Sequence, residues 1–69
     1  MTTCLSEQMR AYAADRPSIV RDFIAKADAF DEAAAGFYAQ PQTHNAAQFL
    51  GAYARARKAW CEATGEPLV

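Results

Sequence analysis

The sequence predicts an all-α protein. We expect an antiparallel hairpin of two long helices, over about residues 17–39 and 44–64, and a short N-terminal helix over about 5–14. Two such hairpins are expected to dimerise into a four-helix bundle. Two observations predict this hairpin. Large and small apolar residues repeat at seven-residue steps in both long segments, and a short turn joins the segments. Residues seven apart return to nearly the same side of a helix, so each segment presents one apolar seam.

The N-terminal segment reads as a short amphipathic helix. Leu5, Met9 and Tyr12 fall at i, i+4 and i+7, and Ser6 offers a hydroxyl as its N-terminal cap. Pro17 then interrupts the chain, because proline is best tolerated in the first turn of a helix. We expect this helix either to cover apolar surface on the hairpin or to move off it when a partner binds.

The first long helix is expected from Pro17 to about residue 39. No further proline interrupts it, and the stretch around residues 25–35 is rich in alanine, the strongest helix former. Asp15 or Arg16 is the expected cap. Its seam starts at Val20 and includes Phe23, Phe30 and Phe37, which repeat every seven residues.

The second long helix follows a turn at residues 40–43. Thr43 or Asn45 could cap it, with Gln48 completing a capping pair with Asn45. Gly65 is expected to close it in the left-handed conformation, with Pro67 just beyond. Because the connection is short, the two long helices should lie side by side and antiparallel.

An antiparallel hairpin fixes which residues face each other. Facing residue numbers should sum to about 83, which pairs Ala34 with Phe49, Phe30 with Tyr53, Ala27 with Ala56 and Phe23 with Trp60. Two helices alone cannot cover such bulky layers, which is why we expect a second hairpin. The residues predicted to hold the hairpin and the dimer together are Val20, Phe23, Ala27, Phe30, Phe37, Phe49, Tyr53, Ala56 and Trp60.

Composition narrows the class of function. A chain of 69 residues forms one domain at most, and its core is thin, so a partner subunit is the expected source of extra stability. The formal charge of −1 argues against broad affinity for nucleic acid or an anionic membrane. No stretch approaches the roughly 20 apolar residues that cross a bilayer. We expect a soluble, cytoplasmic protein.

The sequence contains no recognisable catalytic or metal-binding pattern. His44 is the one histidine, and no Glu-x-x-His pair exists for a bundle metal site. Cys61 lies about 25 Å along the same helix from His44, so the two cannot act together in one chain. Cys4 and Cys61 are expected to be reduced thiols, with a disulfide between them as the alternative. We expect no enzyme activity, cofactor or metal.

A group of basic residues suggests an alternative function. Arg55, Arg57 and Lys58 could contact phosphate, with Tyr53 and Trp60 beside them in sequence. Dimerisation would align two copies of this group into one stripe. The rival prediction is therefore a small nucleic-acid-associated dimer, although the aromatic residues fall on the apolar seam and fit a core better.

The leading prediction is a protein that works by binding another protein, as a regulator, inhibitor or adaptor. In size and hairpin shape it resembles small phage-encoded and plasmid-encoded helical proteins that bind and block host factors. Trp, Tyr and Arg are over-represented where binding energy concentrates. The candidate partner-binding residues are Tyr12, Tyr38, Arg55, Arg57 and Lys58.

Overall fold

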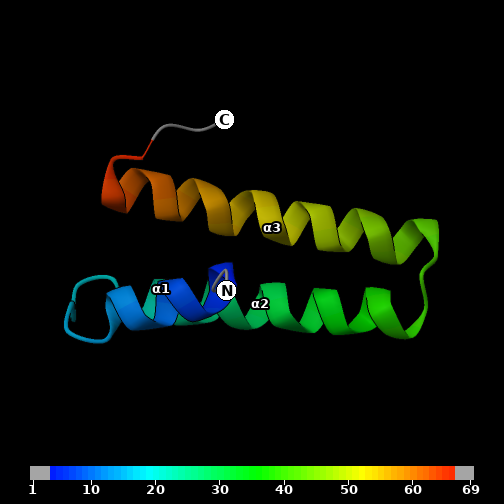
Figure 1. The fold of residues 1–69 in the computed structure, drawn as a ribbon, viewed down its shortest axis with the longest axis horizontal. Coiled ribbons are helices and arrows are strands. Elements are labelled where there is room, and N and C mark those ends of the chain that lie inside the picture. The colour runs from blue at the N-terminus through cyan, green and yellow to red at the C-terminus, as the bar shows by residue number, and fades with distance from the viewer. Residues whose placement is uncertain (1–3, 67–69) are drawn as a thin grey trace.

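The protein is all-α, with two long antiparallel helices and a short third one. The computed structural model describes residues 4–66. Its helices are α1 (Leu5–Ala13), α2 (Val20–Ala39) and α3 (Thr43–Thr64). Figure 1 shows α2 and α3 running side by side in opposite directions, with α1 against the half of the hairpin where α2 begins. The predicted helical class, the antiparallel hairpin and the short N-terminal helix are confirmed.

α1 begins one residue before the expected cap. Cys4 is the N-cap residue, and its carbonyl accepts a hydrogen bond of 3.0 Å from the Gln8 amide. Ser6 lies inside the helix and is only 2% exposed, so its prediction as the cap was wrong. Its hydroxyl is 2.9 Å from the Cys4 sulfur and hydrogen-bonds Asp31 of α2. The Ser6 side chain therefore links α1 to α2 and does not cap α1.

α2 begins later than the sequence predicted. Residues 17–19 form a turn in which the Arg16 carbonyl accepts hydrogen bonds from the amides of Ile19 and Val20. Ile19 is the N-cap, without a side-chain cap. Asp15 and Arg16 do not cap α2 because both are engaged at the end of α1. The Arg16 guanidinium pairs with Asp15 at 2.8 Å and lies 3.8 Å from the centre of the Tyr12 ring.

The two ends of α3 differ in how well the sequence predicted them. Neither Thr43 nor Asn45 caps its start; Gln42 is the N-cap, without a side-chain bond. Asn45 instead donates to the Gln40 carbonyl at 2.8 Å, which ties the turn to the helix. The predicted end is confirmed: Gly65 has φ 79° and its amide donates to the Cys61 carbonyl at 2.8 Å.

The seam between α2 and α3 follows the predicted register at Phe30, Phe49 and Tyr53. The rings of Phe30 and Tyr53, whose numbers sum to 83, have centres 5.9 Å apart. Phe49 lies between the rings of Phe30 and Phe37, at 5.5 and 5.6 Å. This agrees with the predicted pairing of Phe49 with Ala34, whose numbers also sum to 83.

The core sits at one end of the hairpin, where three helices meet. Its fully or almost fully buried members are Met9, Ala13, Phe23, Ala27 and Ala56, and Leu5, Tyr12, Ile19, Val20, Ala59 and Trp60 pack against them. The Tyr12 ring stacks on Phe23 at 5.9 Å and meets Trp60 edge-on at 5.3 Å. The sequence predicted a direct contact between Phe23 and Trp60, but the Tyr12 ring of α1 contacts both of them.

No helix within residues 4–66 is both long enough and apolar enough to cross a membrane.

Candidate interaction surface

α1 covers only about half of the hairpin. The first turn of α1 lies beside Asp31 of α2. The Asp31 carboxylate accepts hydrogen bonds from Ser6 and from Arg10. The C-terminal part of α1 reaches the end of α3, where the Tyr12 hydroxyl donates to the Ala63 carbonyl at 3.2 Å. α1 has nine residues, whereas α2 and α3 have 20 and 22. The part of the hairpin beyond Asp31 therefore has no third helix over it (Figure 1).

A polar clasp, formed by Arg10 in the last turn of α1 with Asp28 and Asp31, holds α1 to α2. The Arg10 guanidinium contacts Asp28 at 2.6 Å and Asp31 at 2.8 Å. The hydrogen bonds with Asp28 and then Asp31 raise the pKa of Arg10. Burial raises the pKa of Asp31, but the hydrogen bond from Ser6 and the nearby Arg10 outweigh it, so the pKa of Asp31 lies below its ordinary value. The contacts of Arg10 with Asp28 and Asp31 therefore favour the docked α1.

The uncovered half is held together by aromatic rings. Besides the contacts of Phe49 with Phe30 and Phe37, the Tyr38 ring lies 6.0 Å from Phe49 and 5.8 Å from Phe37. Ring centres at these separations are within the range of favourable aromatic pairs. We call the five rings the aromatic cluster: Phe30, Phe37, Tyr38, Phe49 and Tyr53. Its three phenylalanines are only half-buried.

Large apolar side chains stay exposed on this half. Tyr38 is 74% exposed, Leu50 66% and Tyr53 40%; Ile24, at 41%, is the fourth large exposed hydrophobic residue of the described part. Tyr53 precedes Trp60 by seven residues, and Trp60 contacts α1, so both lie on the side of α3 that faces α1. Tyr38 follows Asp31 by seven residues and shares its side of α2. The exposed surface therefore continues the face that α1 occupies.

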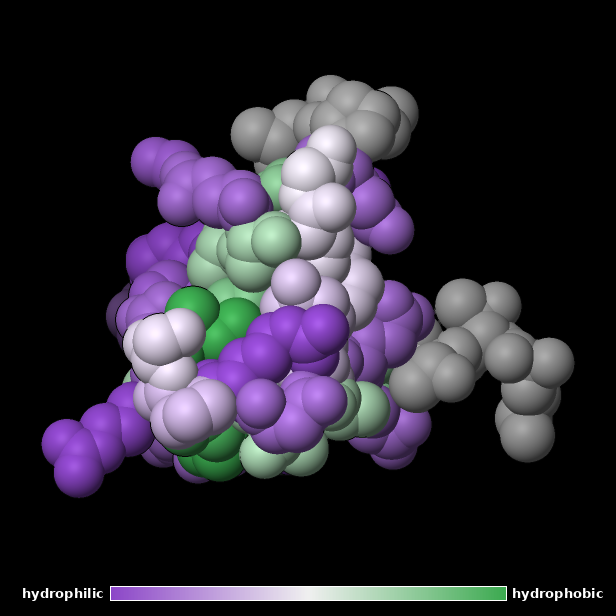
Figure 2. All heavy atoms as spheres, turned by 90° about the vertical axis from the view of Figure 1, so that its left-hand side faces the viewer, coloured by the Kyte–Doolittle hydropathy of each residue, from purple (hydrophilic) through white to green (hydrophobic). Residues whose placement is uncertain are grey.

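The same half is poor in charged side chains. Residues 33–54 contain no Asp, Glu, Lys or Arg, although both helices and their turn belong to this stretch. We call residues 33–54 the tip. Figure 2 looks onto the opposite end of the molecule, where hydrophilic side chains surround small apolar areas. The charge-free run is visible in the sequence, but the seven-residue repeat does not depend on charge and so did not predict the tip as a surface.

The other side of the hairpin holds an open groove of about 550 Å³. Small residues form much of its lining, and Glu32 and Arg55 add one charge of each sign where the tip meets the rest of the hairpin. The lining residues are Ala29, Glu32, Ala33, Gly36, Asn45, Gln48, Ala52 and Arg55. Both sides of the tip therefore present surface without a third helix.

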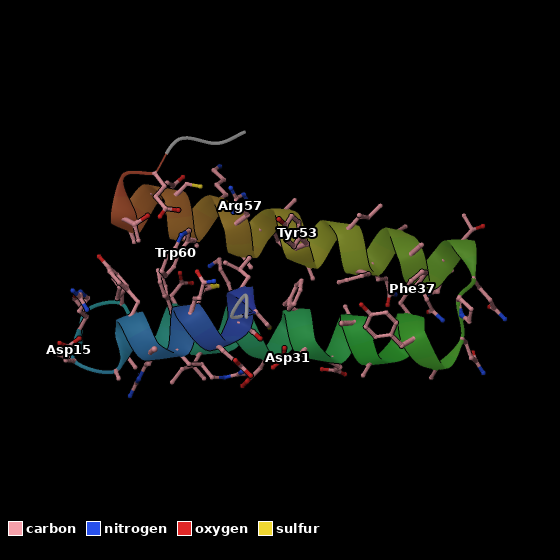
Figure 3. All side chains as sticks on the ribbon, in the orientation of Figure 1. Asp15, Asp31, Phe37, Tyr53, Arg57 and Trp60 are labelled. Carbon is pink, nitrogen blue, oxygen red and sulfur yellow. The ribbon has the colours of Figure 1, made fainter. Side chains whose placement is uncertain are left out.

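The structure places the predicted partner-binding residues in different surroundings. Tyr12 lies in the core cluster, so its ring is engaged within the chain. Tyr38 is the most exposed of the large apolar residues. Arg57 is half-buried, and Figure 3 shows it on α3 between Tyr53 and Trp60. These residues do not form one continuous patch.

The basic residues of α3 spread around the helix. Successive residues are rotated by about 100°, so Arg55 and Lys58, three residues apart, lie on one side of α3, whereas Arg57 points away from both. Arg55 lines the groove, while the Lys58 ammonium lies 4.0 Å from Glu62 on the same helix. One chain therefore does not arrange them as a single stripe for a phosphate backbone.

Both cysteines described by the structure are free thiols. Cys4 is exposed at the start of α1, and the hydrogen bond with Ser6 is the main cause that lowers the pKa of its thiol. Cys61 is buried on α3 and follows Trp60, which contacts Tyr12 near the C-terminal end of α1. About 12 Å of helix separates those ends at 1.5 Å per residue, which is too far for a disulfide.

Residues 4–66 contain no group of three or more His, Cys, Asp or Glu side chains that could hold a metal ion. His44 is exposed, and its Nε2 lies 3.1 Å from the Gln48 amide nitrogen.

Comparisons of the chain with protein-family models, with curated proteins and with solved structures found no match.

Proposed function

We propose that this chain acts by binding another protein, as a regulator, inhibitor or adaptor, and that the tip is its binding surface. The observation that carries the proposal is the pairing of exposed Tyr38, Leu50 and Tyr53 with the charge-free run of residues 33–54. Depletion of charge and enrichment in aromatic residues distinguish the centres of protein interfaces from other surface.

The proposal includes association of the chain with itself. The phenylalanines of the aromatic cluster are half-buried within one chain, and a second hairpin over them would complete a four-helix bundle. A closed dimer would also supply burial that a chain of 69 residues lacks by itself. Light scattering across a range of protein concentrations measures this association. A folded monomer at every concentration would contradict it.

Binding to another protein is tested by affinity capture from extract of the native cell with three baits. The baits are the wild-type chain, Leu50→Glu and Ala11→Glu. Leu50 lies on the tip, whereas Ala11 is exposed on α1, and both substitutions add one carboxylate. The expected result is a protein captured by the wild type and by Ala11→Glu but lost with Leu50→Glu. A protein captured equally by all three baits would show that the tip is not the surface used.

A further inference from the structure

We infer that two copies of this chain associate in a staggered way, tip on tip, with each α1 limiting how far the hairpins overlap. This inference rests on the proposed function and specifies its dimer. In this arrangement one face of each hairpin is covered along its length, by its own α1 over one half and by the partner's tip over the other.

The shape of the chain excludes a full overlap of the hairpin faces. α1 lies on the same face as the exposed Tyr38 and Tyr53, and its first turn, at Ser6, lies beside Asp31. A second hairpin laid along the whole face would meet α1 before it reached the aromatic cluster. It can contact these rings only beyond the start of α1, in the layer that α1 itself occupies. About 16 Å of α3, from Thr43 to Tyr53, is open to it at 1.5 Å per residue.

Charge selects what can cover this surface. A carboxylate or ammonium group buried against residues 33–54 would find no charged partner there, and an unpaired buried charge is strongly unfavourable. The occupant must therefore offer a charge-free apolar surface of similar length. The tip of a second copy meets both conditions.

Charge also argues against the other symmetric arrangement, in which each tip packs on the outer surface of the partner's α1. That surface follows the line Glu7, Ala11 and Ala14, spaced at i, i+4 and i+7 and all exposed. Packing the tip on this line would bury the Glu7 carboxylate against residues without charge. The tip-on-tip contact buries no ionised side chain from residues 33–54.

A two-fold axis completes the arrangement. Dimers of identical chains usually use the same patch on both copies, so every contact occurs twice. With the turn at residues 40–42 included, the open stretch runs from residue 40 to Tyr53, so the axis passes near its middle, where the two copies of α3 run antiparallel. Ala46 lies there, seven residues before Tyr53 and on the same side of the helix, so it meets its own copy. A standard protein interface buries about 800 Å² of surface on each partner, and this short overlap buries less. We therefore expect a dissociation constant in the micromolar range.

The test compares two charge substitutions by sedimentation equilibrium from micromolar to millimolar concentration. Leu50 precedes Tyr53 by three residues and lies beside it on α3. Leu50→Glu is expected to raise the dissociation constant by about a hundredfold or more, because both copies then bring a carboxylate into the interface. Ala11→Glu is the matched control and is expected to change it by less than about twofold. Circular dichroism establishes that both variants fold, as expected for positions exposed in the monomer.

A cysteine substitution adds a second measurement. Ala46→Cys is expected to form an inter-chain disulfide with its own copy under mild oxidation, and Ala11→Cys is not. Mass spectrometry of the linked peptides distinguishes these bonds from any made by Cys4 or Cys61.

Each outcome decides the inference. Loss of the dimer with Leu50→Glu alone, together with the Ala46→Cys disulfide, supports the staggered dimer. Loss of the dimer with both glutamate variants overturns it in favour of the packing on α1, while self-association itself stands. A monomer throughout, or a dimer unaffected by Leu50→Glu, also overturns it. The capture experiment with a foreign protein is read separately, so a failure of the dimer is not mistaken for a failure of partner binding.

Discussion

The phenylalanines that repeat every seven residues in α2 have different surroundings in the two halves of the hairpin. In the half covered by α1, Phe23 is 2% exposed and stacks on Tyr12. In the other half, Phe37 is half-buried and contacts Tyr38 and Phe49. The covered half also holds the ion pairs of Arg10, whereas the tip has no charged residue. A repeat in sequence therefore fixes which side of a helix faces its neighbour, but a third helix decides whether that side becomes a core or a surface.

The largest difference between the halves is expected from truncating one phenylalanine in each. Phe23→Ala should lower the free energy of unfolding by about 3–5 kcal/mol, because it leaves a cavity among buried side chains. Phe37→Ala should cost about 1–2 kcal/mol in the monomer, because the ring is only partly removed from water. Urea unfolding followed by circular dichroism, at a concentration where the chain is monomeric, measures both. Equal losses would show that the halves do not differ in packing.

Two glycines offer a smaller contrast. Gly65 has φ 79°, where a Cβ is unfavourable, so Gly65→Ala should cost about 1 kcal/mol. Gly36 lies within α2 at the groove, and a Cβ there would meet no atom within 4 Å. Gly36→Ala should raise the free energy of unfolding by about 0.5–1 kcal/mol. Thermal unfolding of the two variants beside the wild type checks the opposite signs, and a stabilised Gly65→Ala would contradict the left-handed helix end.

A single hydrogen bond tests how firmly α1 is docked. Tyr12→Phe keeps the ring between Phe23 and Trp60 but removes the bond to the Ala63 carbonyl. Because this bond is exposed, its loss should cost about 0.5 kcal/mol, at the low end for a hydrogen bond. Hydrogen exchange of the α1 amides should rise slightly while α3 amides at the tip stay unchanged. A similar rise at the tip would mean that the halves open together.

Acid should act on the covered half through Asp31. The pKa of this group is lowered in the folded protein, so its stabilising contribution is complete above its ordinary pKa of about 3.9 and is lost as the pH falls through the lowered value. Asp31→Asn should therefore reduce the loss of stability on acidification. Unfolding measured from neutral to acid pH, for both proteins, gives the comparison. Asp22→Asn, on an exposed side of α2, is the matched control.

The sequence predicted the hairpin because its period is a property of the helix itself. Residues such as Phe30 and Tyr53 meet where the seven-residue step and the short turn require. The helix starts were predicted less well, because Ser6, Asp15 and Asn45 each had another partner available. Such a competition between partners depends on tertiary contacts that a local pattern does not contain.

The position of α1 was the main feature that the sequence left open. Leu5, Met9 and Tyr12 identify its apolar side but not which part of the hairpin it covers. That depends on the length of the turn before Val20 and on the pairing of Arg10 with Asp28 and Asp31. Of the candidate surface, the sequence predicted Tyr38 as a partner-binding residue, which stays a prediction. Leu50 and the charge-free run were identified as parts of one surface only when the position of α1 was known.

The uneven distribution of charge means that the two halves should respond to different solutes. Raising the concentration of sodium chloride screens the Arg10 clasp, which is largely exposed, and leaves a surface without ions unaffected. Sulfate strengthens the burial of apolar groups and so favours whatever contact the tip makes. A choice of salt can thus loosen one half of this small protein while it tightens the other, and each half can be studied without altering a residue.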